Sequence, residues 1–362
     1  MKDAIYKTYY KKKGQAVVDM NNASIDHGIN ELVSVDIPES WLTAEDTPVQ
    51  QEKPAFIRDV VDVMNRQEGN SLPVSTMVKY GLADGTWPAG TSKFEKRGAA
   101  VEVPAWDSSK CLQCNQCALV CPHAAIRPIL LDEAEESAKP AEFETVAAKG
   151  MNGKYTYRLQ VSPYDCLGCG VCLTACPAEG ALTMTSFEDM KPEQTLFDEV
   201  AMNESYLKKD VINDKSVKNV QFAKPYFQFS AACAGCAETT YIKLLTQLFG
   251  DRMYIGNAAG CSSAISGGAP ILPYCKDCQG HGPAWEHSLF EDNAEFAYGF
   301  FHAQDSIRKE LLIRLEAIKA AGIAVEAVEA YENGWKKTET SRTVTDALIA
   351  ALEQAEQTED VK

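Results

Sequence analysis

The sequence lacks a long apolar run, an excess of positive charge and an export signal. Its apolar stretches are all shorter than the roughly 20 residues that a membrane-spanning helix needs, so we expect no membrane association. The 51 acidic residues outnumber the 35 basic ones, and the net charge of −16 repels the phosphates of nucleic acids. The basic start, MKDAIYKTYYKKKG, precedes neither an apolar segment nor a small-residue cleavage site. We therefore expect a cytoplasmic protein with no nucleic-acid partner.

What the chain does have is enough apolar residues for several cores, together with many cysteines. Its 362 residues, of which 45% are hydrophobic and 24% charged, suffice for two or three globular domains. The 13 cysteines are an odd number in a chain without an export signal. This argues against an extracellular disulfide framework and for metal or redox chemistry in a reducing compartment.

Eight of the cysteines form an internal repeat. The segments KCLQCNQCALVCP (110–122) and DCLGCGVCLTACP (165–177) share the pattern C-x2-C-x2-C-x3-C-P. Three cysteines at this spacing surround a tight loop, which can hold three corners of an iron–sulfur cube. The fourth cysteine, which we place on a short helix beginning at the proline, ligates the other cluster in two-cluster ferredoxins. The repeat therefore predicts two [4Fe–4S] clusters, one on Cys111, Cys114, Cys117 and Cys176, and one on Cys166, Cys169, Cys172 and Cys121.

The alternative for the repeat is a zinc site or a set of buried thiols. Zinc sites usually join two C-x-x-C pairs across a longer gap, which these four-cysteine runs do not resemble. Gly168 and Gly170 suit turns that aim backbone N–H groups at cluster sulfurs. Pro122 and Pro177 suit the first turn of a helix. These features favour the clusters.

The rest of the chain predicts an α+β architecture of several domains. Apolar periodicity or strand alternation predicts helices at 15–35, 54–66, 237–249 and 289–319, a last helix near Thr343 with Asp346 as its capping partner, and strands at 154–161 and 252–256. The helix and strand after 227 have the rhythm of a parallel sheet. We expect the acidic insert at 131–150 to be a solvated flap and 178–220 to be a charged connector. The small residues of 258–270 let the backbone approach a ligand closely.

Five cysteines lie outside the repeat. Cys233 and Cys236 form one C-x-x-C pair, and Cys261 follows in the loop of small residues. Free thiols, zinc or a third cluster would each fit these three. Cys275 and Cys278 form a second pair, for which zinc, a cluster or surface thiols are possible.

These motifs together resemble those of the pyruvate:ferredoxin (flavodoxin) oxidoreductases. Those thiamine-diphosphate enzymes oxidatively decarboxylate pyruvate to acetyl-CoA and pass electrons to ferredoxin or flavodoxin. DMNNASIDHGI (19–29) is similar to the end of their gamma-type domain, and GTSKFEKRG (90–98) carries the EKR signature of a small domain. The repeats resemble their inserted ferredoxin domain. FSAACAGCAETTYIKLLTQLFGDRM (229–253) and GPAWEHSLFEDNAEFAYG (282–299) resemble the opening of their thiamine-binding domain.

The resemblance implies a ferredoxin-like 2[4Fe–4S] domain between a small irregular α+β EKR domain and a partial α/β thiamine-diphosphate-binding domain. The implied ranges are 1–35 for the tail of the gamma-type domain, 36–107 for the EKR domain, 108–190 for the dicluster domain, 191–226 for a connector and 227–362 for the start of the thiamine-binding domain. It also implies a homodimer and an external acceptor, ferredoxin or flavodoxin. Electrons then leave a thiamine intermediate one at a time and cross the clusters to that acceptor.

The resemblance also implies roles for the other cysteines. Cys233, Cys236 and Cys261 fall on three ligands of a third, proximal [4Fe–4S] cluster. Glu238 and Cys261 fall on positions that contact thiamine diphosphate. Ala237 departs from the family, which has glycine there, and Cys275 and Cys278 match no family feature.

The GDG…N motif that holds Mg²⁺ and diphosphate, and the pyruvate-binding domains, have no counterpart in the chain. We therefore expect an internal stretch of the enzyme that carries no catalytic residue and does not turn over pyruvate alone. The third cluster and thiamine diphosphate with Mg²⁺ would form only with the missing domains or chains as partners. The alternatives are a free-standing dicluster electron carrier with docking extensions and a zinc-bound scaffold. Against the carrier, the sequence from 227 onward has catalytic-domain motifs that a ferredoxin does not need.

Overall fold

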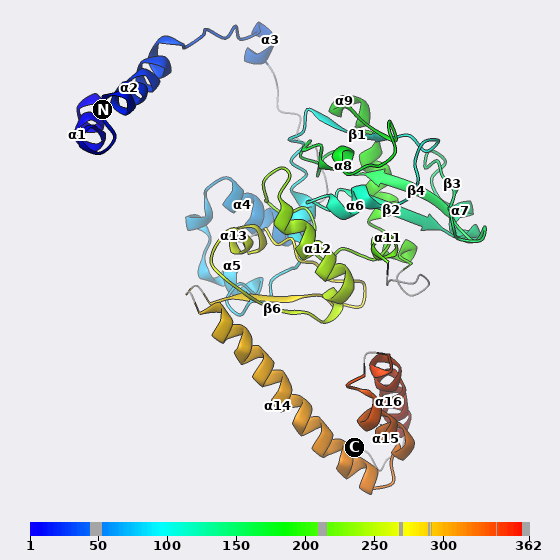
Figure 1. Cartoon of the computed structure of the whole chain (residues 1–362). Helices are drawn as coiled ribbons and strands as arrows, with labels where there is room; N and C mark the ends of the chain where they lie inside the picture. Colours follow the sequence, from blue (N-terminus) through cyan, green and yellow to red (C-terminus); the bar gives the residue numbers. More distant parts are fainter. Residues whose placement is uncertain are drawn as a thin grey trace. The chain divides into compact units, whose positions relative to one another are not determined.

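The computed structural model describes residues 1–43, 53–208, 216–267, 271–288, 290, 292–337 and 339–356. The chain divides into two compact units, Met1–Glu52 and Lys53–Lys362, which we describe separately (Figure 1). No helix within the described ranges is both long and apolar enough to cross a membrane.

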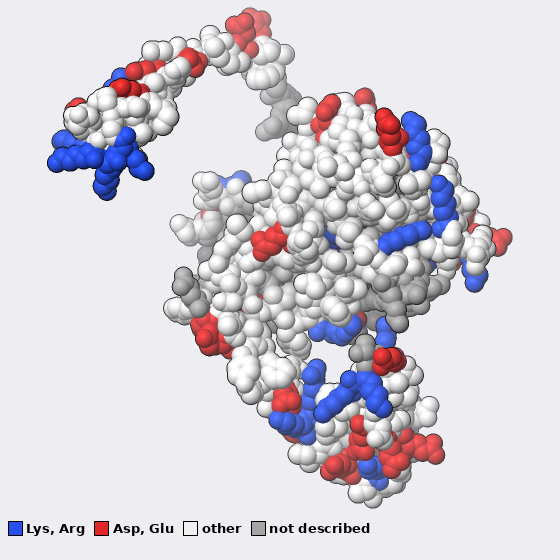
Figure 2. Space-filling model, in the orientation of Figure 1, with Lys and Arg blue, Asp and Glu red and all other residues white. Residues whose placement is uncertain are grey.

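The first unit consists of helices α1 (Lys2–Lys13), α2 (Gln15–Asn30) and α3 (Glu39–Leu42). The predicted helix at 15–35 is confirmed as far as Asn30, and α1 packs against it. Val18 is buried, but Ile29 and Leu32 of the predicted apolar face are exposed. Lysines gather at the end of α1, as Figure 2 shows, because Lys11, Lys12 and Lys13 form its last turn.

The second unit begins with short helical turns around a small apolar core. The turns are η1 (Ile57–Val61), α4 (Asp62–Asn65), η2 (Gly69–Ser71), α5 (Val74–Lys79) and η3 (Thr91–Phe94). The predicted helix at 54–66 is confirmed, although its middle is a π-helix. Phe56, Ile57, Val60 and Val61 are buried together.

Two antiparallel sheets frame the cysteine repeats. β1 (Glu102–Trp106) pairs with β5 (Leu182–Ser186), and β2 (Ile126–Leu131) pairs with β4 (Thr156–Val161), which also pairs with β3 (Val146–Ala147). The strand before the first cysteine loop thus pairs with the strand after the second, and the strand after the first loop pairs with the one before the second. Short helices α6 (Gln116–Val120) and α8 (Val171–Thr174) lie within the repeats and contact each other. This mixed helix and sheet arrangement holds the two loops together.

The acidic insert between the repeats is folded, so the prediction of a solvated flap is wrong. Asp132 caps α7 (Glu133–Ala138) in a capping box with Glu135, and β3 joins the sheet. Phe143 is fully buried among residues of other elements. Its cluster also contains Ile129, Leu131, Phe197, Val200, Ala201 and Phe229. One large apolar side chain is enough to fix an otherwise polar insert on the core.

The predicted connector at 178–220 also contains regular structure and buried residues. After β5 come α9 (Phe187–Met190), α10 (Glu193–Leu196), η4 (Phe197–Ala201), η5 (Glu204–Tyr206) and α11 (Val217–Val220). Phe197 and Val200 are buried in the same cluster as Phe143. This segment therefore packs on the dicluster core.

The C-terminal part begins with the predicted α/β rhythm. α12 (Ala237–Phe249) has the predicted bounds, and after η6 (Gly250–Arg252) strand β6 (Tyr254–Asn257) pairs in parallel with β7 (Ala284–His287). α13 (Cys261–Ser266) follows β6, while 268–270 of the predicted small-residue loop lie outside the described residues.

Three helices end the described chain: α14 (Asn293–Ala320), α15 (Val325–Gly334) and α16 (Ser341–Glu356). The helix predicted at 289–319 is confirmed, but of its apolar stripe only Leu315 is buried, and Ile307 is 57% exposed. Because α16 begins at Ser341, the predicted capping pair of Thr343 with Asp346 is wrong. Asp346 instead lies 3.9 Å from Arg342, one turn away.

Phe143 provides a test of the folded insert. Truncation to alanine removes a fully buried ring, so we expect Phe143→Ala to lower the free energy of unfolding by about 3–5 kcal/mol. Its exposed neighbour is the control, and Glu142→Ala should change that energy by no more than about 0.5 kcal/mol. Denaturant unfolding followed by circular dichroism measures both, and equal, small effects would mean that the insert is a flap after all.

Candidate metal centre

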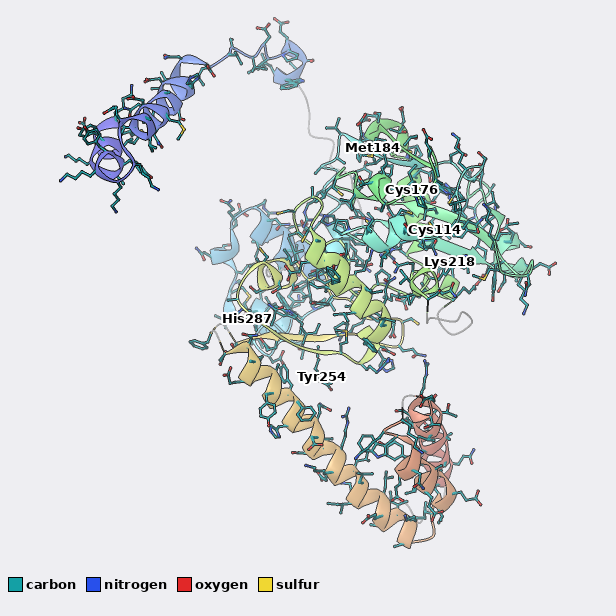
Figure 3. All side chains as sticks on the ribbon, in the orientation of Figure 1. Cys114, Cys176, Met184, Lys218, Tyr254 and His287 are labelled. Carbon is teal, nitrogen blue, oxygen red and sulfur yellow. The ribbon has the colours of Figure 1, made fainter. Side chains whose placement is uncertain are left out.

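The first-repeat thiols line a cavity together with one thiol of the second repeat. Cys111, Cys114 and Cys117 come from the first loop, and Cys176 comes from the chain that follows α8 (Figure 3). The cavity has a volume of about 20 Å³, and Trp106, Tyr157 and Leu159 are among its apolar walls.

The second-repeat thiols line a matching cavity. Cys166, Cys169 and Cys172 surround it with Cys121 of the first repeat, and its volume of about 20 Å³ matches that of the first. The structure therefore brings each fourth cysteine to the loop of the other repeat. The grouping that the cysteine spacing predicts is thus confirmed. The use of these thiols as cluster ligands stays a prediction.

The prolines do not begin helices as predicted. α6 ends at Val120 and α8 ends at Thr174, so the fourth cysteines follow the helices, and Pro122 lies in a turn. Cys121 is extended, with ψ of 114°, because the residue before a proline is excluded from the helical region. Proline thus ends α6 and releases Cys121 toward the other loop.

Both loops turn at equivalent positions with left-handed backbone. Gln113 and Asn115 of the first loop have φ of 57° and 60°, and Gly168 and Gly170 of the second have 64° and 71°. The predicted N–H bond to sulfur is present at Gly168, whose nitrogen lies 3.4 Å from Cys166 Sγ. Gln113 donates in the same way to Cys111 Sγ at 3.3 Å. Sequence reasoning missed the first-loop residues, although aligning the two repeats would have found them.

Side-chain hydrogen bonds offset the left-handed strain in the first loop. Gln113 donates to the carbonyl of Ala147 and accepts from the backbone of Lys149. Asn115 donates to the carbonyl of Lys218 and accepts from the hydroxyl of Tyr157. Asn and similar polar residues tolerate this conformation when they are anchored locally. The first loop is therefore held by side chains, and the second by glycines.

The buried thiols need a cation to become thiolates. Burial, reinforced by neighbouring cysteines, raises the pKa of Cys166 and Cys172 to about 12 and raises that of Cys117 further. A bound metal supplies the positive charge that deprotonates such thiols. In the part of the chain that the structure describes, no three His, Cys, Asp or Glu side chains lie close enough for a single ion. Four thiols around a cavity suit a cluster that fills the space between its ligands.

Two families match parts of the chain. Residues 43–100 match the EKR domain, described as a domain of unknown function, and residues 110–181 match the 4Fe–4S dicluster domain. The repeat region is therefore a dicluster domain for two [4Fe–4S] clusters, and the zinc alternative is not favoured.

Curated relatives extend the similarity over most of the chain. A pyruvate-flavodoxin oxidoreductase of Enterobacter agglomerans is 50% identical over 310 residues, which cover 85% of this chain and 26% of that protein. One of Klebsiella pneumoniae is 45% identical over 334 residues, 91% of this chain and 28% of that protein. A pyruvate:ferredoxin oxidoreductase of Moorella thermoacetica is 45% identical over 363 residues, 97% of this chain and 30% of that protein.

The chain is homologous to one part of the pyruvate:ferredoxin (flavodoxin) oxidoreductases. It spans less than a third of the length of these three relatives.

The residues that give the EKR domain its name connect it to the second cysteine loop. Lys96 Nζ lies 2.8 Å from Asp165 Oδ2 and 3.1 Å from Asp198 Oδ1. Asp165 directly precedes Cys166, and its side chain is 3% exposed. Arg97 donates to the carbonyl of Ser230, in the segment that leads to the next cysteines. The EKR residues thus hold two cysteine-bearing segments of the dicluster region.

A buried lysine connects α12 to the dicluster domain. Lys243 is 2% exposed, and its amine donates to the carbonyls of Ala118, Leu119 and Cys121, the latter two at 3.0 and 2.9 Å. Burial lowers its pKa to about 8. Sequence reasoning missed Lys243 because a lysine in an amphipathic helix is normally solvated.

The remaining cysteines are less enclosed. Gly235, between Cys233 and Cys236, packs against the second loop, since a side chain there would lie 3.8 Å from Cys169 Cβ. Cys233 is exposed, and Cys261 is an exposed residue at the start of α13. Glu238 lies exposed in the first turn of α12. Among the described residues these side chains do not form a close group.

The two cysteines without a family counterpart differ from each other. Cys275 is buried, and Gly90 packs so closely on its Cβ that a side chain at Gly90 would clash. Cys278 is exposed, and its backbone nitrogen donates to Glu204.

The two glycines of the second loop allow a paired test. A methyl group at Gly170 meets nothing within 4 Å, so Gly170→Ala should cost only the left-handed strain of roughly 1–2 kcal/mol. At Gly168 the same methyl would lie 3.0 Å from the carbonyl oxygen of Glu102, so Gly168→Ala should lower the unfolding midpoint further. Thermal unfolding of both variants measures the difference, and equal midpoints would show that backbone crowding is unimportant.

The ion pair of the EKR domain provides a second test. Lys96→Met leaves the buried carboxylate of Asp165 without its cation, and we expect a loss of about 3 kcal/mol of stability. Lys191→Met is the matched control, because Lys191 pairs with Glu188 at the surface and should contribute less than about 1 kcal/mol. Denaturant titration compares the two. Losses of similar size would contradict a structural role for the EKR lysine.

Proposed function

We propose that the chain is the electron-transfer portion of a pyruvate:ferredoxin (flavodoxin) oxidoreductase. The observation that carries the proposal is the exchange of fourth cysteines between two matching cavities. Cys111, Cys114, Cys117 and Cys176 would hold one [4Fe–4S] cluster, and Cys166, Cys169, Cys172 and Cys121 the other. The clusters supply one-electron transfer.

The chain's own residues position and isolate these two sites. Cys117 lies within α6 and Cys121 follows its end, so this single short helix joins both cysteine sets at close range. The walls of both cavities are mainly apolar, and the N–H groups of Gln113 and Gly168 donate to sulfur. Hydrogen bonds to sulfur and burial are the features by which a protein adjusts a cluster's potential.

The arrangement also supports an order for electron transfer, from the loop of Cys233 and Cys236 through the two cavities to the surface. The loop of Cys233 and Cys236 lies against the second cysteine loop. On the other side, Trp106 and Leu159 line both the first cavity and a larger pocket bordered by Glu142, Glu144 and Glu193, among other residues. That pocket is where we place the approach of the acceptor, a flavodoxin or ferredoxin of the kind named in the relatives.

The remaining roles rest on the family resemblance. Cys233, Cys236 and Cys261 would supply three ligands of a third cluster, and Glu238 and Cys261 would contact thiamine diphosphate. The exposure of Cys233, Cys261 and Glu238 supports this, because it leaves them free to meet parts of the enzyme outside this chain. We propose those parts as partners, together with assembly as a homodimer and the domain ranges given above.

The alternative of a free-standing electron carrier has less support. Similarity to the oxidoreductases covers 85% to 97% of this chain in the three relatives named, well beyond the dicluster domain. We place the protein in the cytoplasm, because all thirteen cysteines are free in the structure and a reducing compartment preserves thiols.

Iron analysis with paired variants tests the ligand assignment. Anaerobically reconstituted protein should bind at least about eight iron atoms, four for each of two clusters. A variant with Cys111, Cys114 and Cys117 changed to serine should keep the second cluster and lose about four of those atoms. In that background Cys176→Ser should leave the remaining electron paramagnetic resonance signal unchanged, whereas Cys121→Ser should abolish or alter it.

Cys278→Ser is the control for removal of an exposed thiol and should change neither iron content nor spectrum. The reverse pattern, with sensitivity to Cys176→Ser and none to Cys121→Ser, would contradict the exchange. Zinc-loaded, iron-free protein would contradict the proposed function.

A further inference from the structure

We propose that Lys243 is a fixed countercharge for the cysteine set that contains Cys121, and that it raises the reduction potential of the cluster bound there. The proposal deepens the proposed function and rests on the ligand role of Cys121.

The hydrogen bonds of Lys243 favour an ammonium over a neutral amine. The nitrogen contacts three carbonyl oxygens, those of Ala118, Leu119 and Cys121, all of which can only accept. Three acceptors require three N–H donors. An ammonium has three, whereas a neutral amine has two. The geometry therefore places a full positive charge at the end of α6.

This charge lacks the carboxylate partner that other buried or half-buried lysines of the same unit have. The ammonium groups of Lys96, Lys208 and Lys224 each contact a carboxylate, of Asp165, Glu135 and Glu204 respectively. Within the described ranges, the contacts of Lys243 are with backbone carbonyls. Burying an unpaired ion costs several kcal/mol, so an anion close by must offset the cost. The groups that can become anionic and whose charge favours the ammonium form of Lys243 are the thiols of Cys121 and Cys117.

A cluster bound by four thiolates is such an anion. The thiolates outweigh the positive charge of the iron–sulfur core, and each reduction adds one more negative charge. A fixed cation at the carbonyl of Cys121 therefore stabilises the reduced form more than the oxidised form, which raises the potential. Because Lys243 contacts Cys121 itself, the effect should be larger for the Cys121 cluster than for the Cys117 cluster.

The position of α12 connects this charge to electron entry. α12 begins directly after Cys236 and packs against α6 (Figure 1). One helix thus carries the C-x-x-C thiols before its first turn and the cation on a later turn. Arg127 adds a second buried cation in the same region, where it donates to the carbonyls of Ala124 and Ala201. Electrons arriving at the C-x-x-C loop would meet a neighbouring site whose reduced form is stabilised.

The test is a redox titration of reconstituted protein, followed by electron paramagnetic resonance and accompanied by iron analysis. The variant lacking Cys111, Cys114 and Cys117 isolates the Cys121 cluster, and Lys243→Met is introduced into both this variant and the full chain. We expect Lys243→Met to lower the midpoint potential of the Cys121 cluster. At a fixed applied potential the ratio of reduced to oxidised cluster should fall at least tenfold, which corresponds to about 59 mV for one electron. The other cluster should shift less.

Two further substitutions separate charge from packing. Lys243→Arg keeps the cation and should stay near the original midpoint. Lys191→Met removes an exposed lysine of the same unit and should leave both midpoints unchanged. Should Lys243→Met lose its iron, Lys243→Gln takes its place, because the amide keeps two N–H donors without the charge.

The outcomes distinguish this proposal from the proposed function. Unchanged midpoints in a neutral variant that binds its full iron would overturn the countercharge while leaving the function intact. Loss of iron in both neutral variants but not in Lys243→Arg would support the proposed role of the Lys243 charge. Loss of iron in all three would mean a packing role only and would overturn it. Wild-type protein without about eight irons would instead refute the proposed function.

Discussion

The structure depends on eight thiols that line two apolar cavities, three of them buried and five partly buried. In such an interior a thiolate is unfavourable, and burial raises the pKa of Cys166 and Cys172 accordingly. Metal binding reverses this balance, because the cluster supplies the positive charge that the cavity lacks. Since each cavity takes three thiols from one loop and one from the other, neither loop can be completed alone. Under the proposed ligand assignment, cluster binding and folding of the whole repeat would therefore be coupled.

The surrounding elements pack on this pair of loops rather than forming independent bodies. The insert contributes Phe143 to a core shared with β2 and η4, the EKR residues neutralise Asp165, and α12 caps the end of α6 through Lys243. Each of these contacts joins residues far apart in the sequence. Together with the pairing of β3, the capping box of α7 and the ion pair of Glu135 with Lys208, these contacts explain why regions that resemble connectors by composition are ordered.

Sequence reasoning succeeded where local chemistry determines structure. The repeat spacing predicts which thiols share a cavity, and apolar periodicity predicts α12 and the parallel strand that follows it. It failed where tertiary contacts decide. Nothing local distinguishes Phe143 in an acidic insert, or Lys243 in an amphipathic helix, from a solvated neighbour. The prediction that the prolines begin helices was wrong because proline restricts the backbone of the preceding residue. At Pro122 this effect ends α6 at Val120 and outweighs the preference of proline for a helix start.

The two halves of the repeat have different surroundings although their backbones match. The first loop is held mainly by neutral groups, with Gln113, Asn115 and the hydroxyl of Tyr157 forming hydrogen bonds, although the exposed Lys149 also donates to the carbonyl of Cys111. The second set lies beside the buried Lys243, which binds the carbonyl of Cys121, whereas the charge of Lys96 next to Cys166 is neutralised by Asp165 and Asp198. A cluster's potential follows local charge and hydrogen bonding, so under the proposed ligand assignment two chemically equal cysteine sets would acquire unequal affinities for an electron. The asymmetry comes from an element that flanks the repeat, because α12 supplies the buried lysine that has no carboxylate partner among the described residues.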